Sequence, residues 1–313
     1  MSGEMLLMIF NFITLALSIV ILAYSSDYFT EGAAKIARRF GVSKFIIGAV
    51  VIGFGTSSPE LFTSVYASLS GTGGIAIGNV IGSNIANIGL ILGLAAFIRA
   101  AAIRKKMEFI NGIACFLLTV LGSILILQGY VVSRLDGILL LLAFAFYIFY
   151  SIKNPANSIH TPDATEDARM AGVHVVFGLA GVLIGSVLLV NSAAAIAHAL
   201  GIPESVIGLT LVAFGTSVPE LAVSLVAAKK GYFTMVVGNV VGSNIFNILL
   251  VLGAAAVASP ILVDSPIAFR STPMMLIVTA LMLIFMRTGW KITRAEGLVL
   301  LLFYGVFLWV SFS

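Results

Sequence analysis

The sequence has little charge, a single cysteine and few histidines. Only 10% of its 313 residues are charged and 60% are hydrophobic, which excludes a soluble globular domain of this length. Cys115 cannot form a disulfide within one chain. His160, His174 and His198 show no pair at metal-ligand spacing. We therefore expect an integral membrane protein without a metal site built from cysteine or histidine.

The charge that is present is mostly basic, with 17 Lys and Arg against 13 Asp and Glu. Positively charged loops on the cytoplasmic side of a membrane explain this excess better than nucleic-acid binding does, so no nucleic-acid partner is expected. No nucleotide-binding motif occurs, and the hydroxyl-rich segments lack a nearby base, so the sequence does not predict an enzyme. The N-terminus has no basic region and carries Glu4, which predicts a retained first span rather than a cleaved signal peptide.

Apolar stretches long enough to cross a bilayer recur along the whole chain. They predict an all-α membrane protein with ten transmembrane helices. The longest polar connection, residues 153–170, separates five of these spans from the other five and is interpreted as a cytoplasmic linker. The expected spans are 5–29, 43–69, 75–97, 108–128, 133–152, 171–195, 202–228, 233–258, 267–287 and 293–312.

The two halves of the chain repeat each other. Residues 41–68 match residues 201–228, and residues 75–96 match residues 235–256. Both matches have the same displacement along the chain, which we call the repeat offset. Because each half has an odd number of spans, the second half must enter the membrane inverted, which places a substrate site near the midplane. The predicted divisions are a first five-helix repeat at 1–152, the linker at 153–170 and an inverted second five-helix repeat at 171–313.

Loop charge agrees with this count. If the N-terminus lies outside, fifteen of the seventeen Lys and Arg fall in inside loops, and only Arg134 and Arg270 fall outside. The sequence therefore predicts a multi-pass protein of the cell membrane with both termini extracytoplasmic.

One hexapeptide occurs twice inside apolar segments, as GTSSPE at 55–60 and as GTSVPE at 215–220. Pro59 and Pro219 lie in mid-span, where each lacks the N–H that would bond to the carbonyl four residues earlier. Freed carbonyls at membrane depth are tolerated where they line a wet cavity. There they can serve as oxygen ligands for hard cations, together with the neighbouring hydroxyls.

Each hexapeptide ends in a glutamate, Glu60 or Glu220. An ionised carboxylate at the bilayer centre costs at least about 2.5–3.5 kcal/mol and marks an ion or proton path by default. The alternative is a neutral, hydrogen-bonded structural glutamate at a helix kink. Two symmetric copies favour the ion path.

A second motif, GNxxGSNxxN, begins at Gly78 and again at Gly238. Its first copy places Asn79, Ser83 and Asn87 on one helix face. The glycines favour close helix packing. Packing is an equally good interpretation of Asn79 and Asn84, whereas ligation is favoured for the residues Ser83, Asn87, Ser243 and Asn247.

Two carboxylates and many neutral oxygens match one divalent hard cation. All-oxygen ligation suits Ca²⁺, which takes 6–8 oxygens in flexible geometry. It suits zinc, copper or iron poorly, because the repeated segments contain no histidine or cysteine.

These paired motifs resemble the alpha repeats of the calcium/cation antiporter superfamily, and most of all its prokaryotic sodium/calcium exchangers. The resemblance implies ten helices in two inverted repeats, Na⁺/Ca²⁺ antiport by alternating access, no cofactor and no obligatory protein partner. It also implies a set of oxygen ligands at the centre. They are Glu60, Glu220, Thr56, Ser57, Thr216, Ser217, the backbone at Gly53 and Ala213, Ser83, Ser243, Asn87 and Asn247.

Asn247 stands where some relatives have aspartate, and in the potassium-dependent branch an acidic residue there is linked to K⁺ use. The amide argues against K⁺ transport and keeps the site charge at minus two, so exchange of three Na⁺ for one Ca²⁺ would be electrogenic. A proton/Ca²⁺ antiporter is the near alternative, although that branch usually has Gly-Asn-x-x-Glu in place of the hexapeptide. A passive cation channel is a more remote one.

The resemblance further implies that the first and sixth spans slide as a unit across the other eight. Gly178, Gly181 and Gly185 of the sixth span suit a smooth sliding face. Small-residue packing without motion is an equally good interpretation of these glycines.

Overall fold

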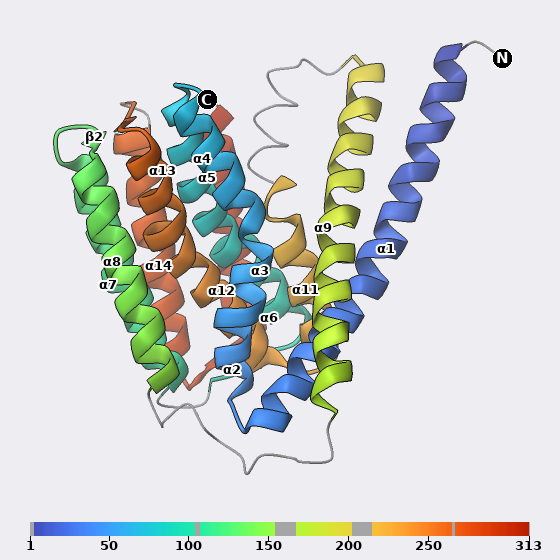
Figure 1. Ribbon diagram of the computed structural model, residues 1–313, viewed down its shortest axis with the longest axis horizontal. Coiled ribbons are helices and arrows are strands. Elements are labelled where there is room, and N and C mark those ends of the chain that lie inside the picture. Colours follow the sequence, from blue (N-terminus) through green and yellow to red (C-terminus); the bar gives the residue numbers. More distant parts are fainter. Residues whose placement is uncertain (1–2, 104–106, 154–166, 202–214, 265–266, 313) are drawn as a thin grey trace.

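The computed structural model describes residues 3–103, 107–153, 167–201, 215–264 and 267–312, and the chain in these ranges is almost entirely helical (Figure 1). The elements up to Lys153 are α1 (Gly3–Phe40), α2 (Lys44–Ile46), the π-helix η1 (Ile47–Ile52), α3 (Gly53–Thr56), α4 (Ser58–Leu69), α5 (Gly73–Ala86), the π-helix η2 (Asn87–Leu92), α6 (Gly93–Ile98), β1 (Ala101–Ala102), α7 (Met107–Leu127), β2 (Val131–Val132) and α8 (Arg134–Lys153). Those that follow are α9 (Ala168–Ala199), α11 (Val218–Lys229), α12 (Phe233–Phe246), the π-helix η4 (Asn247–Val251), α13 (Leu252–Ala258), β3 (Ile261–Leu262), the π-helix η5 (Ile267–Ser271), α14 (Thr272–Arg287), β4 (Lys291–Ile292) and α15 (Arg294–Phe312).

Eight helices in the described ranges are long and apolar enough to cross a membrane, and a ninth span is counted if the bent pair Lys44–Thr56 and Ser58–Leu69 is taken as one. The predicted segment 202–228 begins in residues outside the described ranges. The remaining expected spans lie close to observed helices. For example, the segment expected at 108–128 is α7, Met107–Leu127.

The first expected span, 5–29, was too short. The helix α1 continues to Phe40 and has 38 residues, so at 1.5 Å per residue it is about 57 Å long, almost twice the hydrocarbon thickness. Charged side chains such as Asp27 and Glu31 end the apolar run without ending the helix, because charged residues can continue a helix even where they lower hydropathy.

The described elements follow the same repeat offset. The strand β1 pairs with β4, and β3 pairs with β2, both antiparallel. Shifted by the repeat offset, β1 falls on β3 and β2 falls on β4, so the two small sheets correspond to each other. The turns match as well, since Tyr130 and Trp290 both have a φ of 55°. Each sheet joins segments on opposite sides of the linker, so the two parts of the chain are fastened together twice.

Loops predicted for opposite sides of the membrane gather at opposite ends of the molecule. The 21-residue helix α7 separates β1 from β2, a distance of about 30 Å. Near β2 and β3, the Ser68 hydroxyl donates a hydrogen bond of 2.9 Å to the Ser259 carbonyl. Figure 1 shows both chain termini at the end where β2 lies.

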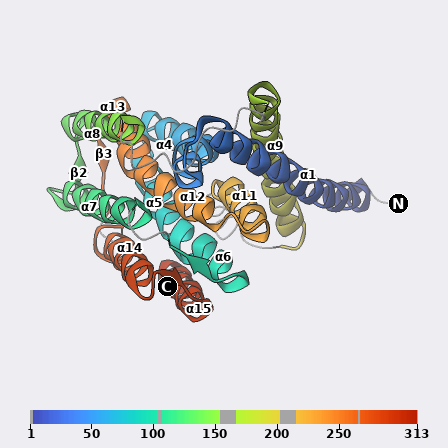
Figure 2. The same ribbon diagram turned by 90° about the horizontal axis from the view of Figure 1, so that it is seen from below.

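The centre of the molecule is formed by α5 and α12, which run through the middle of the helix bundle (Figure 2). In the most apolar windows of the spans that contain them, 78% and 83% of residues are buried. The corresponding shares are 11% for α1 and 22% for α9. The helices α1 and α9 pack along each other at one edge of the bundle and expose most of their surface, as a lipid-facing pair would.

The glycines of α9 face α1 rather than the rest of the bundle. A side chain at Gly178 would lie 2.6 Å from the backbone nitrogen of Phe29, and one at Gly181 would collide with Ser25. At Gly185 it would lie 3.0 Å from Leu22. Of the two interpretations of these glycines, the structure supports small-residue packing and not a face that slides over the other spans. They form the seam that joins α1 to α9.

Candidate cation site

The first hexapeptide breaks a helix, and the second has the same backbone geometry at the corresponding position. The helix α3 ends at Thr56, Ser57 has a ψ of 7°, and α4 starts at Ser58 with a bend of 44°. In the second copy Ser217 has a ψ of 1° and α11 starts at Val218. The 44° bend confirms the kink predicted at Pro59. Pro59 and Pro219 both occupy the first turn of the helix that follows, where the missing N–H is harmless.

Each break places a glutamate at a helix N-terminus. Glu60 and Glu220 lie in the first turn of α4 and of α11, and each is only 1% exposed. The free backbone N–H groups and the dipole of a helix start favour a negative charge there. This explains how two carboxylates can be held inside an apolar bundle without a lysine or arginine. Within the described ranges neither glutamate forms an ion pair.

The two hexapeptides contact each other across the centre. The Ser57 hydroxyl donates a hydrogen bond of 3.0 Å to Glu220 Oε1, and Thr56 also interacts with Glu220. Thr216 interacts with Glu60 in the corresponding way. The second oxygen, Oε2, of each glutamate is buried and has no hydrogen-bond donor. Each carboxylate is therefore oriented by the opposite hexapeptide and keeps one free oxygen.

The polar stripe of α5 joins these contacts. Asn79 Nδ2 donates to Ser64 Oγ over 2.9 Å, and Asn79 Oδ1 accepts a hydrogen bond of 3.1 Å from Thr216 Oγ1. In α12, Asn239 donates to Ser224 over 3.0 Å. Asn79 therefore links α4, α5 and the second hexapeptide, and its side-chain contacts are those of a packing residue.

Four asparagines form two crossed hydrogen bonds between the end of α5 with the start of η2 and the end of α12 with the start of η4. Asn247 Nδ2 donates to Asn84 Oδ1 over 3.1 Å, and Asn87 Nδ2 donates to Asn244 Oδ1 over 3.0 Å. In addition, Asn84 and Asn244 each donate to the backbone carbonyl of the other, over 3.5 and 3.3 Å. The Oδ1 atoms of Asn87 and Asn247 are buried and lack a donor. Each of these two amides donates an N–H to the opposite repeat, which fixes its orientation and leaves its oxygen available.

Ser83 and Ser243 complete the polar centre. Both are fully buried, and neither hydroxyl has a hydrogen-bond partner. Gly53 lies directly against Ser243, since a side chain at Gly53 would come within 3.1 Å of the Ser243 nitrogen. The Gly53 carbonyl accepts a hydrogen bond of 3.0 Å from Ser57 N, so only its second lone pair remains available.

The unpaired buried oxygens at the centre include three pairs related by the repeat offset. They are Glu60 and Glu220 Oε2, Ser83 and Ser243 Oγ, and Asn87 and Asn247 Oδ1. Ser217 Oγ of the second hexapeptide and Asn239 Oδ1 of α12 are also buried without a partner. Buried polar atoms without partners are costly, and a group of acceptors without donors is the environment that a hard cation requires. We call these three pairs the oxygen cage.

Of the other predicted ligands, Ser57 donates to Glu220. Thr56 and Thr216 lie beside the opposite carboxylates, and their hydroxyls donate to the Ile52 carbonyl and to Asn79, respectively. Ala213 lies outside the described residues. Among the described residues, no group of three or more histidine, cysteine, aspartate or glutamate side chains could hold a metal ion, so the candidate site depends on neutral oxygens as well as on the two carboxylates.

Close helix packing brings these residues together. A side chain at Gly242 would lie 2.5 Å from the Ala49 Cα, which confirms the packing role expected for the second GxxxG surface. Gly78 and Gly82 are the repeat counterparts of Gly238 and Gly242. The segment that they would contact, near residue 209, lies outside the described ranges.

The edge pair of helices covers both hexapeptides. A side chain at Gly55 would lie 3.0 Å from Leu179 and 3.6 Å from Phe29, and one at Gly215 would lie 3.1 Å from Val190. The pair α1 and α9 therefore lies directly against the two segments that carry the glutamates.

The model of the sodium/calcium exchanger protein family matches residues 10–153 and 171–313. The chain belongs to this family. It is 36% identical over 345 residues to the sodium/calcium exchanger MaX1 of Methanosarcina acetivorans, covering 96% of this chain and 98% of the relative. It is 40% identical over 290 residues to a membrane protein of Methanocaldococcus jannaschii, covering 92% and 93%.

Solved structures of a sodium-calcium exchanger share this fold. A structure of NCX_Mj soaked with Na⁺ and Sr²⁺ superposes with a TM-score of 0.86 at 38% identity, covering 95% of this chain and 97% of the other. The resemblance to the calcium/cation antiporters is thereby confirmed, and so is a multi-pass membrane protein. The family is one of exchangers, not of enzymes.

Proposed function

We propose that this protein is a secondary antiporter that exchanges Na⁺ for Ca²⁺ across the cell membrane by alternating access. The observation that carries the proposal is the oxygen cage, in which Glu60 and Glu220 meet at the centre of the bundle with donor-free oxygens around them. Na⁺ and Ca²⁺ are both hard cations that such oxygens can bind. The exchangers MaX1 and NCX_Mj support this choice of ions.

In the proposed site, the two glutamates are the charged ligands that Ca²⁺ and Na⁺ share. Neutral oxygens come from Ser83 and Ser243 in α5 and α12, and from Asn87 and Asn247 at the starts of η2 and η4. The remaining oxygens come from the hexapeptide hydroxyls and from the backbone just before each hexapeptide. They belong to Thr56, Ser57, Thr216 and Ser217, and to the backbone at Gly53 and Ala213. The transported ions are substrates, and the proposal requires no cofactor and no partner protein.

Two carboxylates give the cage a charge of minus two. One Ca²⁺ neutralises it and three Na⁺ leave it at plus one, so exchange in this ratio carries net charge across the membrane. Asn247 contributes no charge, and its amide nitrogen donates a hydrogen bond of 3.1 Å to Asn84 Oδ1. The proposal is therefore that exchange is electrogenic and independent of K⁺.

The proposed topology has ten spans in two inverted repeats, at 1–152 and 171–313, joined by a cytoplasmic linker at 153–170, with both termini outside. The cross-linked sheets β1–β4 and β2–β3 support it. So does the family model, which matches the chain in two pieces on either side of the linker. Two repeats of opposite orientation give a carrier two related conformations, one open to each side.

Alternating access requires an element that uncovers the cage. The exposed pair α1 and α9 is suited to this role, because its helices are locked to each other by the glycine seam and lie against both hexapeptides through Phe29, Leu179 and Val190. The proposed motion is a displacement of this pair relative to the other helices.

The test is transport in liposomes containing the purified protein. Liposomes loaded with Na⁺ and diluted into medium without Na⁺ should take up ⁴⁵Ca²⁺, and the uptake should increase when the membrane potential is set to draw out positive charge. Added K⁺ should not change the rate. Uptake driven equally well by a pH gradient without Na⁺ would replace this proposal with proton/Ca²⁺ exchange. Uptake that needs no counter-gradient and is never concentrative would indicate a channel.

A further inference from the structure

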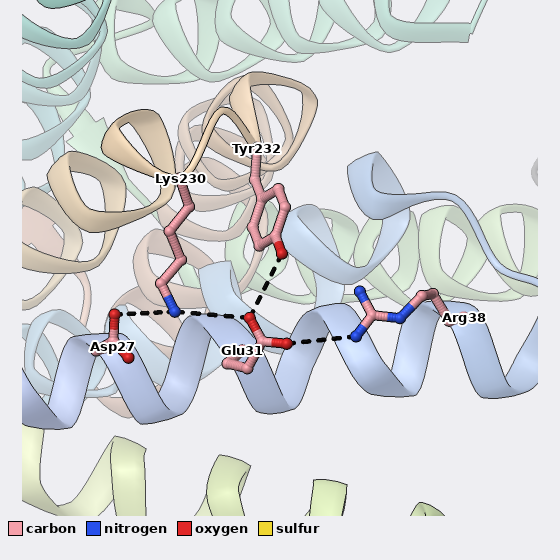
Figure 3. Close-up of polar contacts among 5 residues, drawn as sticks. All are labelled: Asp27, Glu31, Arg38, Lys230 and Tyr232. Carbon is pink, nitrogen blue, oxygen red and sulfur yellow. Dashed lines mark hydrogen bonds and ion pairs between the residues drawn. The ribbon is translucent and has the colours of Figure 1, made fainter. Parts of the chain in front are cut away.

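A cluster of charged side chains fastens the C-terminal half of α1 to the turn between α11 and α12 (Figure 3). Lys230 Nζ lies 2.8 Å from Asp27 Oδ1 and 3.5 Å from Glu31 Oε2. Tyr232 donates a hydrogen bond of 3.4 Å to Glu31 Oε2, and Arg38 Nη2 lies 3.3 Å from Glu31 Oε1. Both oxygens of Glu31 are therefore engaged. We call Asp27, Glu31, Lys230 and Tyr232 the α1 latch.

The latch joins α1 to helices other than α9. Phe29 faces the α9 glycine seam, and the acidic side chains two residues before and after it project from the other side of the helix. Figure 3 shows the acidic side chains pointing away from α9 and toward the α11–α12 turn. Lys44 of α2 lies over the Tyr232 ring, 3.6 Å from its centroid, so the latch is also in contact with the start of the first hexapeptide's span.

The latch has no counterpart at the other end of the molecule. The positions related to it by the repeat offset are Val187 and Asn191 on α9, and Ser70 and Thr72 in the α4–α5 turn. None of these four side chains can carry a charge, so they cannot form ion pairs with one another. The crossed asparagine bonds at the oxygen cage repeat in both halves, whereas the latch is present in one half only.

This asymmetry bears on the two conformations of the carrier. If the repeats were identical, the states open to either side would have the same free energy, because each would be the other with the halves exchanged. Contacts found on one side alone make the two states unequal. The latch lies among the Lys- and Arg-rich loops, the side predicted to be cytoplasmic.

We propose that Glu31 and Lys230 are positioning residues for transport, which hold the cytoplasmic end of α1 against the α11–α12 turn and so favour the state in which the cage is closed to the cytoplasm. The inference rests on the proposed function. Each partner is partly exposed, 30% for Glu31 and 25% for Lys230. A group of such contacts shifts the ratio of the two states by about two- to tenfold.

The test is the apparent KM for Ca²⁺ measured at each face, in everted and right-side-out vesicles from cells expressing the full chain. The apparent KM at one face rises as the state open to that face becomes less populated. Glu31→Gln and Lys230→Gln should each lower the KM at the cytoplasmic face and raise it at the outer face, by about two- to tenfold together. The double variant should resemble either single one, because both changes break the same contact.

Lys230→Arg, which keeps the charge, should leave the KM values at both faces close to those of the native chain. The matched control is Lys229→Gln, which removes the neighbouring positive charge. Lys229 forms no ion pair within the described ranges, so both KM values should stay as in the native chain. Amide hydrogen exchange in residues 230–233 should become faster in the Glu31 variant and not in the control, a result that does not depend on transport.

KM values that move in the same direction at both faces, or unchanged KM values together with unchanged hydrogen exchange, would overturn the role of the latch. Effects of Glu31→Gln and Lys230→Gln that simply add would also contradict it. A native chain that performs no Na⁺-dependent Ca²⁺ exchange in these vesicles would refute the proposed function instead, so the two failures can be distinguished.

Discussion

Replacing Glu220 by glutamine should abolish Ca²⁺ exchange while leaving the fold intact. Glu220 Oε1 accepts a hydrogen bond from Ser57, and Oε2 is a donor-free oxygen of the cage. Glutamine keeps the size and one carbonyl oxygen. However, it removes one of two charges and brings N–H donors to a site built from acceptors. Because Ser57 can donate to an amide oxygen as well, the contact between the hexapeptides can persist.

The structure allows the size of the effect to be estimated. Glu220 is 1% exposed, and removing one partner of a buried charged contact costs about 3–5 kcal/mol. That cost raises the dissociation constant of Ca²⁺ by about 150- to 4,000-fold. Since Coulomb energy is proportional to the charge of the ion, each Na⁺ should lose about half as much, or about 10- to 60-fold. The variant should therefore be deficient in Ca²⁺ binding more than in Na⁺ binding.

Isothermal titration of the purified protein with CaCl₂, and separately with NaCl, measures both quantities. Glu60→Gln should weaken Ca²⁺ and Na⁺ binding in the same way, because the two positions are related by the repeat. Glu108→Gln is the matched control, since Glu108 is equally buried at 1% exposure but lies on α7. Equal weakening of Na⁺ and Ca²⁺, or a Glu220 variant that binds Ca²⁺ like the native chain, would refute the reasoning from charge.

Two further predictions concern the asparagine pairs and the helix seam. Asn84→Ala should lower the free energy of unfolding by about 1–3 kcal/mol, because Asn247 Nδ2 loses its acceptor in a buried position. It should also weaken Ca²⁺ binding. An unchanged melting temperature together with an unchanged Ca²⁺ affinity would show that the crossed asparagine bonds do not orient the cage. Gly181→Ala should lower the free energy of thermal unfolding by about 1–3 kcal/mol, since the added carbon meets Ser25. The control is Gly172→Ala on the same helix, whose added carbon has no neighbour within 4 Å among the described atoms and which should be neutral or slightly stabilising. Equal effects of the two substitutions would contradict the packing of α9 against α1.

Much of the fold follows from hydropathy and repetition. Expected and observed limits differ by one residue at α7 and at the start of α15, because turns and β-bridges bound these spans sharply. The hexapeptide kink could be predicted from Pro59 and Pro219, because a missing N–H has the same consequence in any helix. Hydropathy could not give the end of α1, since Asp27, Glu31 and Arg38 interrupt the apolar run while the helix continues.

Features that depend on contacts between distant segments could not be predicted. The π-helices η2 and η4 both begin at motif asparagines, Asn87 and Asn247, but no sequence signal distinguishes a π-turn from an α-turn there. The pairing of β1 with β4 joins two-residue strands that lie far apart in the chain, and their sequences have no strand-like alternation long enough to recognise.

The candidate site was predicted in part. Glu60 and Glu220, with the hydroxyls beside them, could be found because polar residues are rare in apolar segments. The direction in which the α9 glycines face could not, since Gly178 and Gly181 suit either side of a helix until its neighbours are known. The role of Asn84 and Asn244 in orienting the amides of Asn247 and Asn87 also required the structure, because it depends on which repeat each side chain reaches.

The most direct test of the oxygen cage is to locate a bound ion. Sr²⁺ is a hard divalent cation that can stand in for Ca²⁺, and its anomalous scattering identifies it in crystals of the protein. The account predicts a strong peak between the carboxylates of Glu60 and Glu220, within reach of Ser83, Ser243 or the two amide oxygens, which diminishes as Na⁺ is raised. A cage without a peak, or a dominant peak at a different cluster such as Asp27 and Glu31, would contradict it.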